Sequence, residues 1–287
     1  MRAFLLSCLL IAAFLFYRRD QNSTRAQDSA ATAAEAAPAA AARTPVASPA
    51  CDAAQRQAGC LRILFVGNSY TYANALPAMF AQLSASANRL VFTGMVATGA
   101  WTLAQHAASE QTLSAIRSTQ WDYVVLQEQS QLPSVPVQRE AQMYPAAINL
   151  AAVAQLAGAK PILYLTWARK GGWPENGMPD FTSMQTEINR GYTQLAQRVG
   201  AGVAPVGPAW ATVTRDHPEI ELWDSDGSHP KPAGTYLAAC VFYATIFGVS
   251  PRGLPYVPRF VTRDEATVLQ SAAAAETVYP TRAWEKP

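Results

Sequence analysis

The chain has 287 residues, of which 50% are apolar and 15% charged, so it can bury a substantial core and is long enough for one α/β domain with appendages. This composition excludes a protein that is disordered over most of its length. The formal net charge is only +2 and the basic residues are scattered, which argues against a nucleic-acid binder.

Residues 1–19 have the layout of an export signal. Arg2 precedes an apolar run over 3–17, and Arg18 and Arg19 follow it. The run is shorter than the about 20 residues of a membrane-spanning helix, which favours a cleaved signal peptide. No small-x-small cleavage site follows directly, so an uncleaved membrane tether through residues 3–17 stays open. Both alternatives predict an exported protein, periplasmic or extracellular.

Residues 20–58 are predicted to form a disordered linker. Alanine dominates it, and large apolar side chains that could offset the entropy of ordering are scarce. Cys51 and Cys60 have a spacing that permits a disulfide in an oxidising compartment, with two free thiols as the alternative. Cys240 lies in an apolar helical stretch, where a buried thiol is expected. The cysteine spacing does not support a structural zinc site.

From residue 59 to residue 287, the pattern alternates between strands and helices. Short apolar runs predict buried parallel strands at 61–66, 90–96, 123–127, 161–166 and 202–206. Helices are predicted at 75–87, 103–118, 138–156, 184–199 and 232–247, with a C-terminal helix and tail within 257–287. The alternation predicts a three-layer α/β/α sandwich with a mostly parallel, flavodoxin-like sheet, because right-handed crossovers place helices on both faces.

The functional site is expected at the carboxyl ends of these strands, where ligands bind in such sheets. Four loops with polar residues or glycine converge there. They are 67–71 after the first strand, 98–100 after the second, 127–131 after the third, and 224–230 before the helix at 232–247.

Ser69, Asp226 and His229 are the candidate catalytic residues. A serine hydroxyl is a weak nucleophile that needs a base, and the base needs an orienting group. Ser69 ends a buried strand behind a glycine, where backbone N–H groups can face an oxyanion. Asp226, three residues before His229, can fold back to accept its imidazole N–H. A helix cap for Ser69 and loop roles for the other two are the alternatives, but the joint placement favours catalysis.

The stretch 65–71 reads Phe-Val-Gly-Asn-Ser-Tyr-Thr and resembles the first block of the SGNH (GDSL-like) hydrolases, with Asn68 where GDSL relatives have Asp. Gly99 matches the second-block glycine, and 226–230 resembles the final Asp-x-x-His-Pro block. The resemblance spans about residues 61–247. It implies an SGNH hydrolase fold and ester hydrolysis through an acyl-enzyme, with no metal and no organic cofactor.

The third block departs from the family pattern, since 127–131 reads Gln-Glu-Gln-Ser-Gln where the family has Gly-x-Asn-Asp. In the family this Asn donates to the oxyanion beside backbone N–H groups that here belong to Ser69 and Gly99. A glutamine amide has the same donor chemistry on a longer arm, so Gln129, or alternatively Gln131, is expected to replace it.

Three further expectations concern the surroundings of the site and its substrate. Glu128 is expected to cap a helix or to form a salt bridge. Trp167 follows the fourth strand, so an aromatic wall that packs on a sugar ring or acyl chain is expected, with a core tryptophan as the alternative. The Gln-rich third block resembles that of some sugar esterases, which favours an acetyl or short acyl ester, on a small molecule or a glycan. Acyl transfer to a polysaccharide and a non-catalytic carbohydrate-binding module are the alternatives.

Overall fold

The computed structural model of the protein describes residues 51–277. The predicted signal peptide or anchor at 1–19, the predicted linker as far as residue 50, and the last part of the tail, 278–287, lie outside the described residues. Within 51–277, no helix has both the length and the apolar character needed to cross a bilayer.

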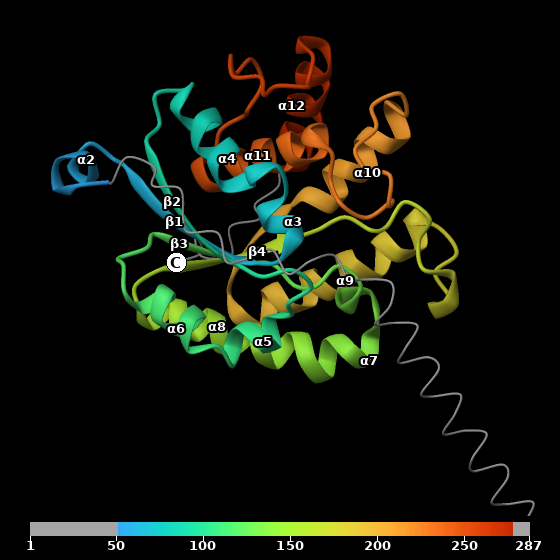
Figure 1. Cartoon of the computed structure of the whole chain (residues 1–287), viewed down its shortest axis with the longest axis horizontal. Helices are drawn as coiled ribbons and strands as arrows, with labels where there is room; N and C mark the ends of the chain where they lie inside the picture. The colour runs from blue at the N-terminus through green and yellow to red at the C-terminus, as the bar shows by residue number, and fades with distance from the viewer. Residues whose placement is uncertain (1–50, 278–287) are drawn as a thin grey trace, which may run out of the picture. The chain divides into compact units, whose positions relative to one another are not determined.

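A parallel sheet of five strands forms the middle of the domain (Figure 1). The strands are β1 (Leu61–Gly67), β2 (Val91–Ala97), β3 (Tyr123–Leu126), β4 (Lys160–Leu165) and β5 (Gly202–Pro205). Each matches a predicted strand within a residue at either end, because buried parallel strands are continuous apolar runs. The order β2-β1-β3-β4-β5 is flavodoxin-like and confirms the predicted fold class. The chain turns from β1 to β2 on one side and later to β3 on the other, so the carboxyl ends of β1 and β3 flank the topological switch point.

Helices cover both faces of the sheet, as right-handed crossovers require. One side in Figure 1 holds α4 (Leu76–Ala85), α10 (Val206–Asp216), α11 (Pro232–Phe247) and α12 (Arg263–Thr277). The other side holds α5 (Leu103–Ala107), α6 (Glu110–Arg117), α8 (Tyr144–Leu156) and α9 (Phe181–Val199). The shorter elements are α2 (Ala53–Gln57), α3 (Ser69–Tyr72), η1 (Ala73–Ala75), η2 (Leu132–Ser134), α7 (Pro136–Gln138), a π-helical turn η3 (Arg139–Met143) and η4 (Pro174–Asn176).

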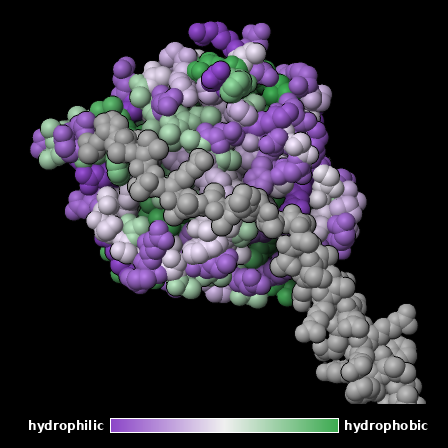
Figure 2. Space-filling model, in the orientation of Figure 1, coloured by the Kyte–Doolittle hydropathy of each residue, from purple (hydrophilic) through white to green (hydrophobic). Residues whose placement is uncertain are grey.

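Each face of the sheet has its own apolar core, since neighbouring strand residues point to opposite faces. In β1, Ile63 and Phe65 join the core under α4 and α11, whereas Leu64 and Val66 join the core under α8 and α9. Helix α11 is buried on nearly all sides, and Cys240 within it is a buried free thiol, as predicted. The visible surface of the described part is mostly hydrophilic, with apolar residues in small groups between (Figure 2).

Two helical regions differ from the sequence expectation. The helix predicted over 103–118 is two helices, because Ser109 caps a new helix start by accepting a hydrogen bond from the Thr112 N–H. The second difference is α10, because the sequence analysis assigns no helix between residues 206 and 232. Gly207 and Pro208 lie in the first turn of α10, where a proline costs the helix no hydrogen bond.

The folded part begins earlier than residue 59. Cys51 and Cys60 are joined by a disulfide with a Cα–Cα distance of 5.9 Å, and both are buried. Between them, α2 begins with a capping box in which the side chains of Asp52 and Gln55 accept each other's backbone N–H. The last part of the predicted linker therefore contains the capped helix α2, and the disulfide fastens this segment to the residue before β1.

Candidate active site

The structure brings Ser69, His229 and Asp226 together at the carboxyl end of β1. Ser69 is the first residue of α3, and the other two lie in the loop before α11. The His229 Nε2 atom is 2.9 Å from the Ser69 Oγ, and Nδ1 is 2.5 Å from the Asp226 Oδ2. Because a carboxylate only accepts, Nδ1 carries the proton and Nε2 is left to accept from the serine hydroxyl. The three predicted catalytic residues thus have the connectivity of a Ser-His-Asp triad.

A tight turn holds the acid-base pair, as the three-residue spacing predicts. The Asp226 Oδ1 accepts hydrogen bonds of 2.9 Å from the backbone N–H groups of both Ser228 and His229. Gly227 has φ +66°, a conformation that favours glycine, and its carbonyl accepts from the Lys170 N–H at 2.8 Å. Partial burial alone would raise the pKa of Asp226, but the bonds from the His229 side chain and from the two N–H groups outweigh it and lower that pKa.

The loop that holds Ser69 is anchored by the side chain of Gln127, directly after β3, a contact that the sequence did not reveal. The Gln127 Oε1 accepts from the Asn68 N–H and from the Thr71 Oγ, both at 2.8 Å. A Cβ at Gly67 would lie 2.4 Å from the same Gln127 oxygen and from the Thr71 hydroxyl, so only glycine fits there. Asn68 in turn caps α3 by accepting from the Tyr70 N–H. The only available sequence signal was a glutamine directly after a fully apolar strand.

His106, which lies within the helix predicted over 103–118, supports the same loop. It is fully buried, and its Nε2 is 2.8 Å from the Gly67 carbonyl, so this nitrogen carries the proton. Its Nδ1 then accepts from the Thr112 hydroxyl at 2.9 Å. Burial lowers the pKa of His106, against the opposing effect of the Gly67 bond. His106 is a neutral support under the nucleophile rather than a second base.

The prediction that Trp167 forms an aromatic wall for the substrate is wrong. Trp167 is 0% exposed, and its ring stacks between Tyr70 at 4.5 Å and Trp210 at 4.1 Å. Its Nε1 donates to the Ser228 carbonyl at 2.9 Å, and the Tyr70 hydroxyl lies 2.7 Å from the Ser228 Oγ. Burial raises the pKa of Tyr70 to about 12, so its hydroxyl stays neutral. Through Ser228, Trp167 and Tyr70 support the loop that holds Asp226 and His229.

The groups predicted to stabilise an oxyanion retain hydrogen-bond donors. Ser69 is the first residue of α3, so its N–H has no partner within the helix. A Cβ at Gly99 would lie 3.2 Å from the Tyr72 hydroxyl, which locates this loop beside α3. The Gln129 Oε1 accepts from the Gln131 and Leu132 N–H groups. Its Nε2 has only a 3.4 Å contact with a neighbouring hydroxyl.

Gln131 is held by a cation instead. Its Oε1 accepts from an Arg169 Nη at 3.1 Å, so its amide N–H groups face away from Arg169. Since both glutamines keep an amide donor, the choice between Gln129 and Gln131 stays open.

Glu128 lies fully buried directly after the strand β3 and Gln127. Its Oε1 accepts from the Leu103 N–H at 3.1 Å and from the Gln129 N–H at 2.6 Å. Burial raises the pKa of Glu128 to about 7, although these two bonds oppose the rise. Leu103 begins α5, so the predicted helix-capping role is present, and no cation within 51–277 pairs with this carboxyl.

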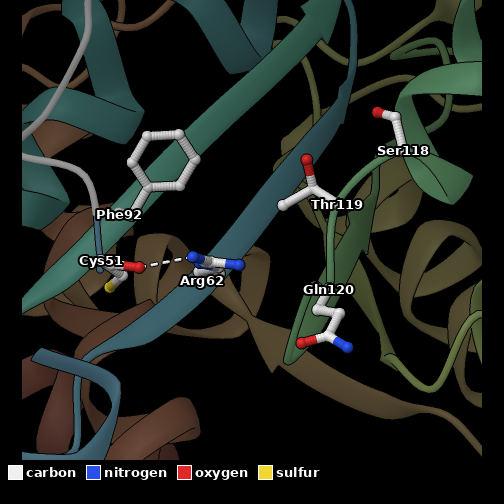
Figure 3. Close-up of a pocket in the computed structure, with 6 residues that line it drawn as sticks. All are labelled: Cys51, Arg62, Phe92, Ser118, Thr119 and Gln120. Atoms are coloured by element: carbon white, nitrogen blue, oxygen red, sulfur yellow. Dashed lines mark hydrogen bonds between the residues drawn. The ribbon is translucent and has the colours of Figure 1, made fainter. Parts of the chain in front are cut away.

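A cavity of about 410 Å³ lies elsewhere, at the amino ends of β1, β2 and β3 (Figure 3). It is lined by Cys51, Arg62, Phe92, Ser118, Thr119 and Gln120. Because the triad lies at the carboxyl ends, this cavity is separate from the candidate active site. Over the described residues, no group of three or more His, Cys, Asp or Glu side chains is arranged to hold a metal ion.

No family model matches the chain, and no curated protein matches it in sequence. Solved structures do. A DUF4886 family protein from Bacteroides uniformis is 19% identical with a TM-score of 0.68, over 77% of this chain and 96% of that one. A candidate SGNH hydrolase from Slackia heliotrinireducens is 33% identical with a TM-score of 0.56, over 65% of this chain and 99% of that one.

A variant of an acetyl-xylooligosaccharide esterase from Geobacillus is 16% identical with a TM-score of 0.50, over 69% of this chain and 96% of that one. At this identity, and at the 19% of the Bacteroides protein, the similarity shows a shared fold.

Proposed function

The chain belongs to the SGNH hydrolase superfamily, and from this premise we propose that it is an exported serine esterase that cleaves an acetyl or short acyl ester through an acyl-enzyme. The observation that carries the proposal is the hydrogen-bonded series from Ser69 through His229 to Asp226, with distances of 2.9 and 2.5 Å. A serine in this arrangement has a base within reach, and the base has a carboxylate that fixes its tautomer.

In the acylation step, His229 Nε2 takes the hydroxyl proton while the Ser69 Oγ bonds to the ester carbonyl carbon. The carbonyl oxygen becomes an oxyanion, to which we assign the N–H groups of Ser69 and Gly99 and an amide of Gln129 or Gln131. When the tetrahedral intermediate collapses, the bond to the alcohol oxygen breaks. The alcohol leaves with the proton held by His229, and the acyl group stays on Ser69.

Water then removes the acyl group by the same steps. His229 takes a proton from water as its oxygen bonds to the acyl carbon, and the Ser69 Oγ leaves with that proton, which frees the carboxylic acid. In both halves Asp226 accepts the hydrogen bond from the Nδ1–H of His229 and stabilises the imidazolium. Its lowered pKa supports this role, because an ionised carboxylate is required.

The exposure of the triad supports an ester on a bulky carrier. The side chains of Asp226 and His229 are 48% and 37% exposed, so the acid-base pair lies at the surface rather than at the end of a tunnel. Such a site can reach an acyl group on a glycan chain. The Gln-rich loop 127–131 adds to the argument for a carbohydrate ester.

Two features support export. Residues 1–19 have the charged-then-apolar layout of an export signal. The Cys51–Cys60 disulfide is of the kind that persists in oxidising compartments such as the periplasm or the exterior. A cleaved signal and a retained tether through residues 3–17 would both be compatible with a disulfide next to β1.

The decisive experiment is intact-mass spectrometry after incubation with a fluorophosphonate, followed by hydrolysis of p-nitrophenyl esters from acetate to long chains. We expect one adduct in the wild type, none in Ser69→Ala, and a fall in turnover of about four or more orders of magnitude in that variant. Absence of both adduct and turnover in the wild type would refute the esterase proposal and favour the carbohydrate-binding module. Such a module would bind glycans equally well in the wild type and in Ser69→Ala.

Product analysis separates hydrolysis from acyl transfer. With an acetylated glycan and an added sugar acceptor, the esterase releases acetic acid at a rate that the acceptor leaves unchanged. A transferase would instead form a new acyl sugar at the expense of the free acid.

A further inference from the structure

Glu128 joins the two loops that carry the proposed oxyanion donors other than Ser69. One carboxyl oxygen accepts from the Leu103 N–H, at the end of the loop that holds Gly99, and from the Gln129 N–H in the third block. The distances are 3.1 and 2.6 Å. The loops follow β2 and β3, which are separated by β1 in the sheet, so strand pairing alone does not connect them.

The side chain of Glu128 is completely enclosed by the protein. Glu128 is 0% exposed, and its own N–H donates to the Tyr192 hydroxyl of α9 at 3.2 Å. Its second carboxyl oxygen is buried without a hydrogen-bond partner. Burial of a carboxyl with an unpartnered oxygen costs free energy, so an apolar side chain would serve stability better at this position. Because packing alone does not explain a carboxyl group at this position, we look for its role in the two hydrogen bonds that it accepts.

We propose that Glu128 is a positioning residue for the oxyanion hole, which sets the distance between the loop of Gly99 and the loop of Gln129 through its one shared oxygen. This inference rests on the proposed esterase function. It assigns Glu128 no contact with the substrate, because the side chain is enclosed beneath both loops.

We call Glu128, with its hydrogen bonds to Leu103 and Gln129, the clamp. The clamp should affect kcat rather than substrate binding. Oxyanion donors must lie about 2.7–3.1 Å from the position that the oxyanion will occupy, so a small displacement of either loop weakens them. The negative charge on that oxygen exists only in the tetrahedral transition state and intermediate. Loss of the clamp therefore lowers kcat and leaves KM nearly unchanged.

Glu128→Gln and Glu128→Ala are the informative pair, assayed on a p-nitrophenyl ester. The glutamine keeps an oxygen that accepts from both N–H groups, so its kcat should stay within about threefold of wild type. The alanine removes the acceptor, so the kcat of this variant should fall by about 30- to 100-fold, which is somewhat less than the fall caused by removing a whole oxyanion donor. Its KM should change less than about twofold.

Gln270→Ala is the matched control for general destabilisation. Gln270 is also a buried polar side chain that joins separate segments, by bonds to the Gly253 N–H, the Leu254 carbonyl and the Tyr236 hydroxyl, but it lies on α12. This variant should lose stability and keep its kcat. If Glu128→Ala keeps wild-type kcat, if Glu128→Gln is as impaired as Glu128→Ala, or if only KM rises, the proposal is overturned.

Hydrogen exchange of the backbone amides tests the clamp without any substrate. In Glu128→Ala, exchange should accelerate in both segments 98–106 and 127–134, whereas in Glu128→Gln both should stay protected. Unchanged exchange in the alanine variant overturns the clamp. A wild-type protein that hydrolyses no ester and takes no fluorophosphonate refutes the proposed esterase instead, and the exchange result then still decides whether Glu128 fixes the loops.

Discussion

Glu128 should also make the stability of the protein depend on pH, in a direction opposite to that of most carboxyl groups. Burial raises its pKa from the ordinary value of 4.5 to about 7. Between these values the folded state holds a proton that the unfolded state has released. The contribution of Glu128 to the free energy of unfolding is therefore fully present below about 4.5 and is lost as the pH rises through about 7.

The size of the effect follows from the same values. A difference of about 2.5 pKa units, at about 1.36 kcal/mol per unit, gives about 3 kcal/mol for this nearly fully buried group. Tyr192 is the titratable neighbour on α9, and since burial raises its pKa it stays neutral over this range. His106, whose pKa is lowered by burial, contributes equally to wild type and to Glu128→Gln, so the difference between these two proteins isolates Glu128.

The assay is urea unfolding at 25 °C in steps from pH 4.5 to pH 8, for wild type and Glu128→Gln. Because glutamine does not titrate, the difference in unfolding free energy between the two proteins should change by about 3 kcal/mol over this range. Glu175→Gln, at an exposed position, should track the wild type. A Glu128→Gln protein with the same pH dependence as the wild type would refute a raised pKa at this carboxyl.

Two other substitutions probe the support of the triad. Gly67→Ala should destabilise the fold by about 1–3 kcal/mol in urea unfolding, because the added methyl would overlap the Gln127 and Thr71 oxygens at 2.4 Å; a wild-type midpoint would contradict this clash. Tyr70→Phe removes the 2.7 Å bond to the Ser228 Oγ and should lower kcat by about tenfold without a change in KM, since the acid-base loop loses one anchor worth about 1–1.5 kcal/mol. An unchanged kcat in that variant would show that the Trp167 bond alone positions the loop.

The fold and the meeting of Ser69, Asp226 and His229 could be predicted because their signals are local. Every strand lies in a short, mainly apolar run, and right-handed crossovers place the helices on both faces of the sheet. Ser69 was identified by its place behind Gly67 at the end of a strand. Asp226 and His229 are close in sequence, so their pairing needed no tertiary information.

The side chains that support the site could not be predicted, because their roles depend on partners far along the chain. Gln127 accepts from Asn68, at a sequence separation of 59, and His106 donates to Gly67, at a separation of 39. Trp167 follows a strand that leads to the site, and its inward direction is set by stacking on Tyr70 and Trp210. No periodicity or motif in the sequence contains these contacts.

The distance along the chain between nucleophile and base has a consequence for biosynthesis. Ser69 and His229 meet across a sequence separation of 160, and His229 lies in the loop directly before α11. In the proposed mechanism, a growing chain therefore carries Ser69 for most of its synthesis without the histidine that activates it. In that mechanism Ser69 becomes reactive only when the loop before α11 has folded against the carboxyl end of β1, so labelling by a serine-directed probe should report this step of folding.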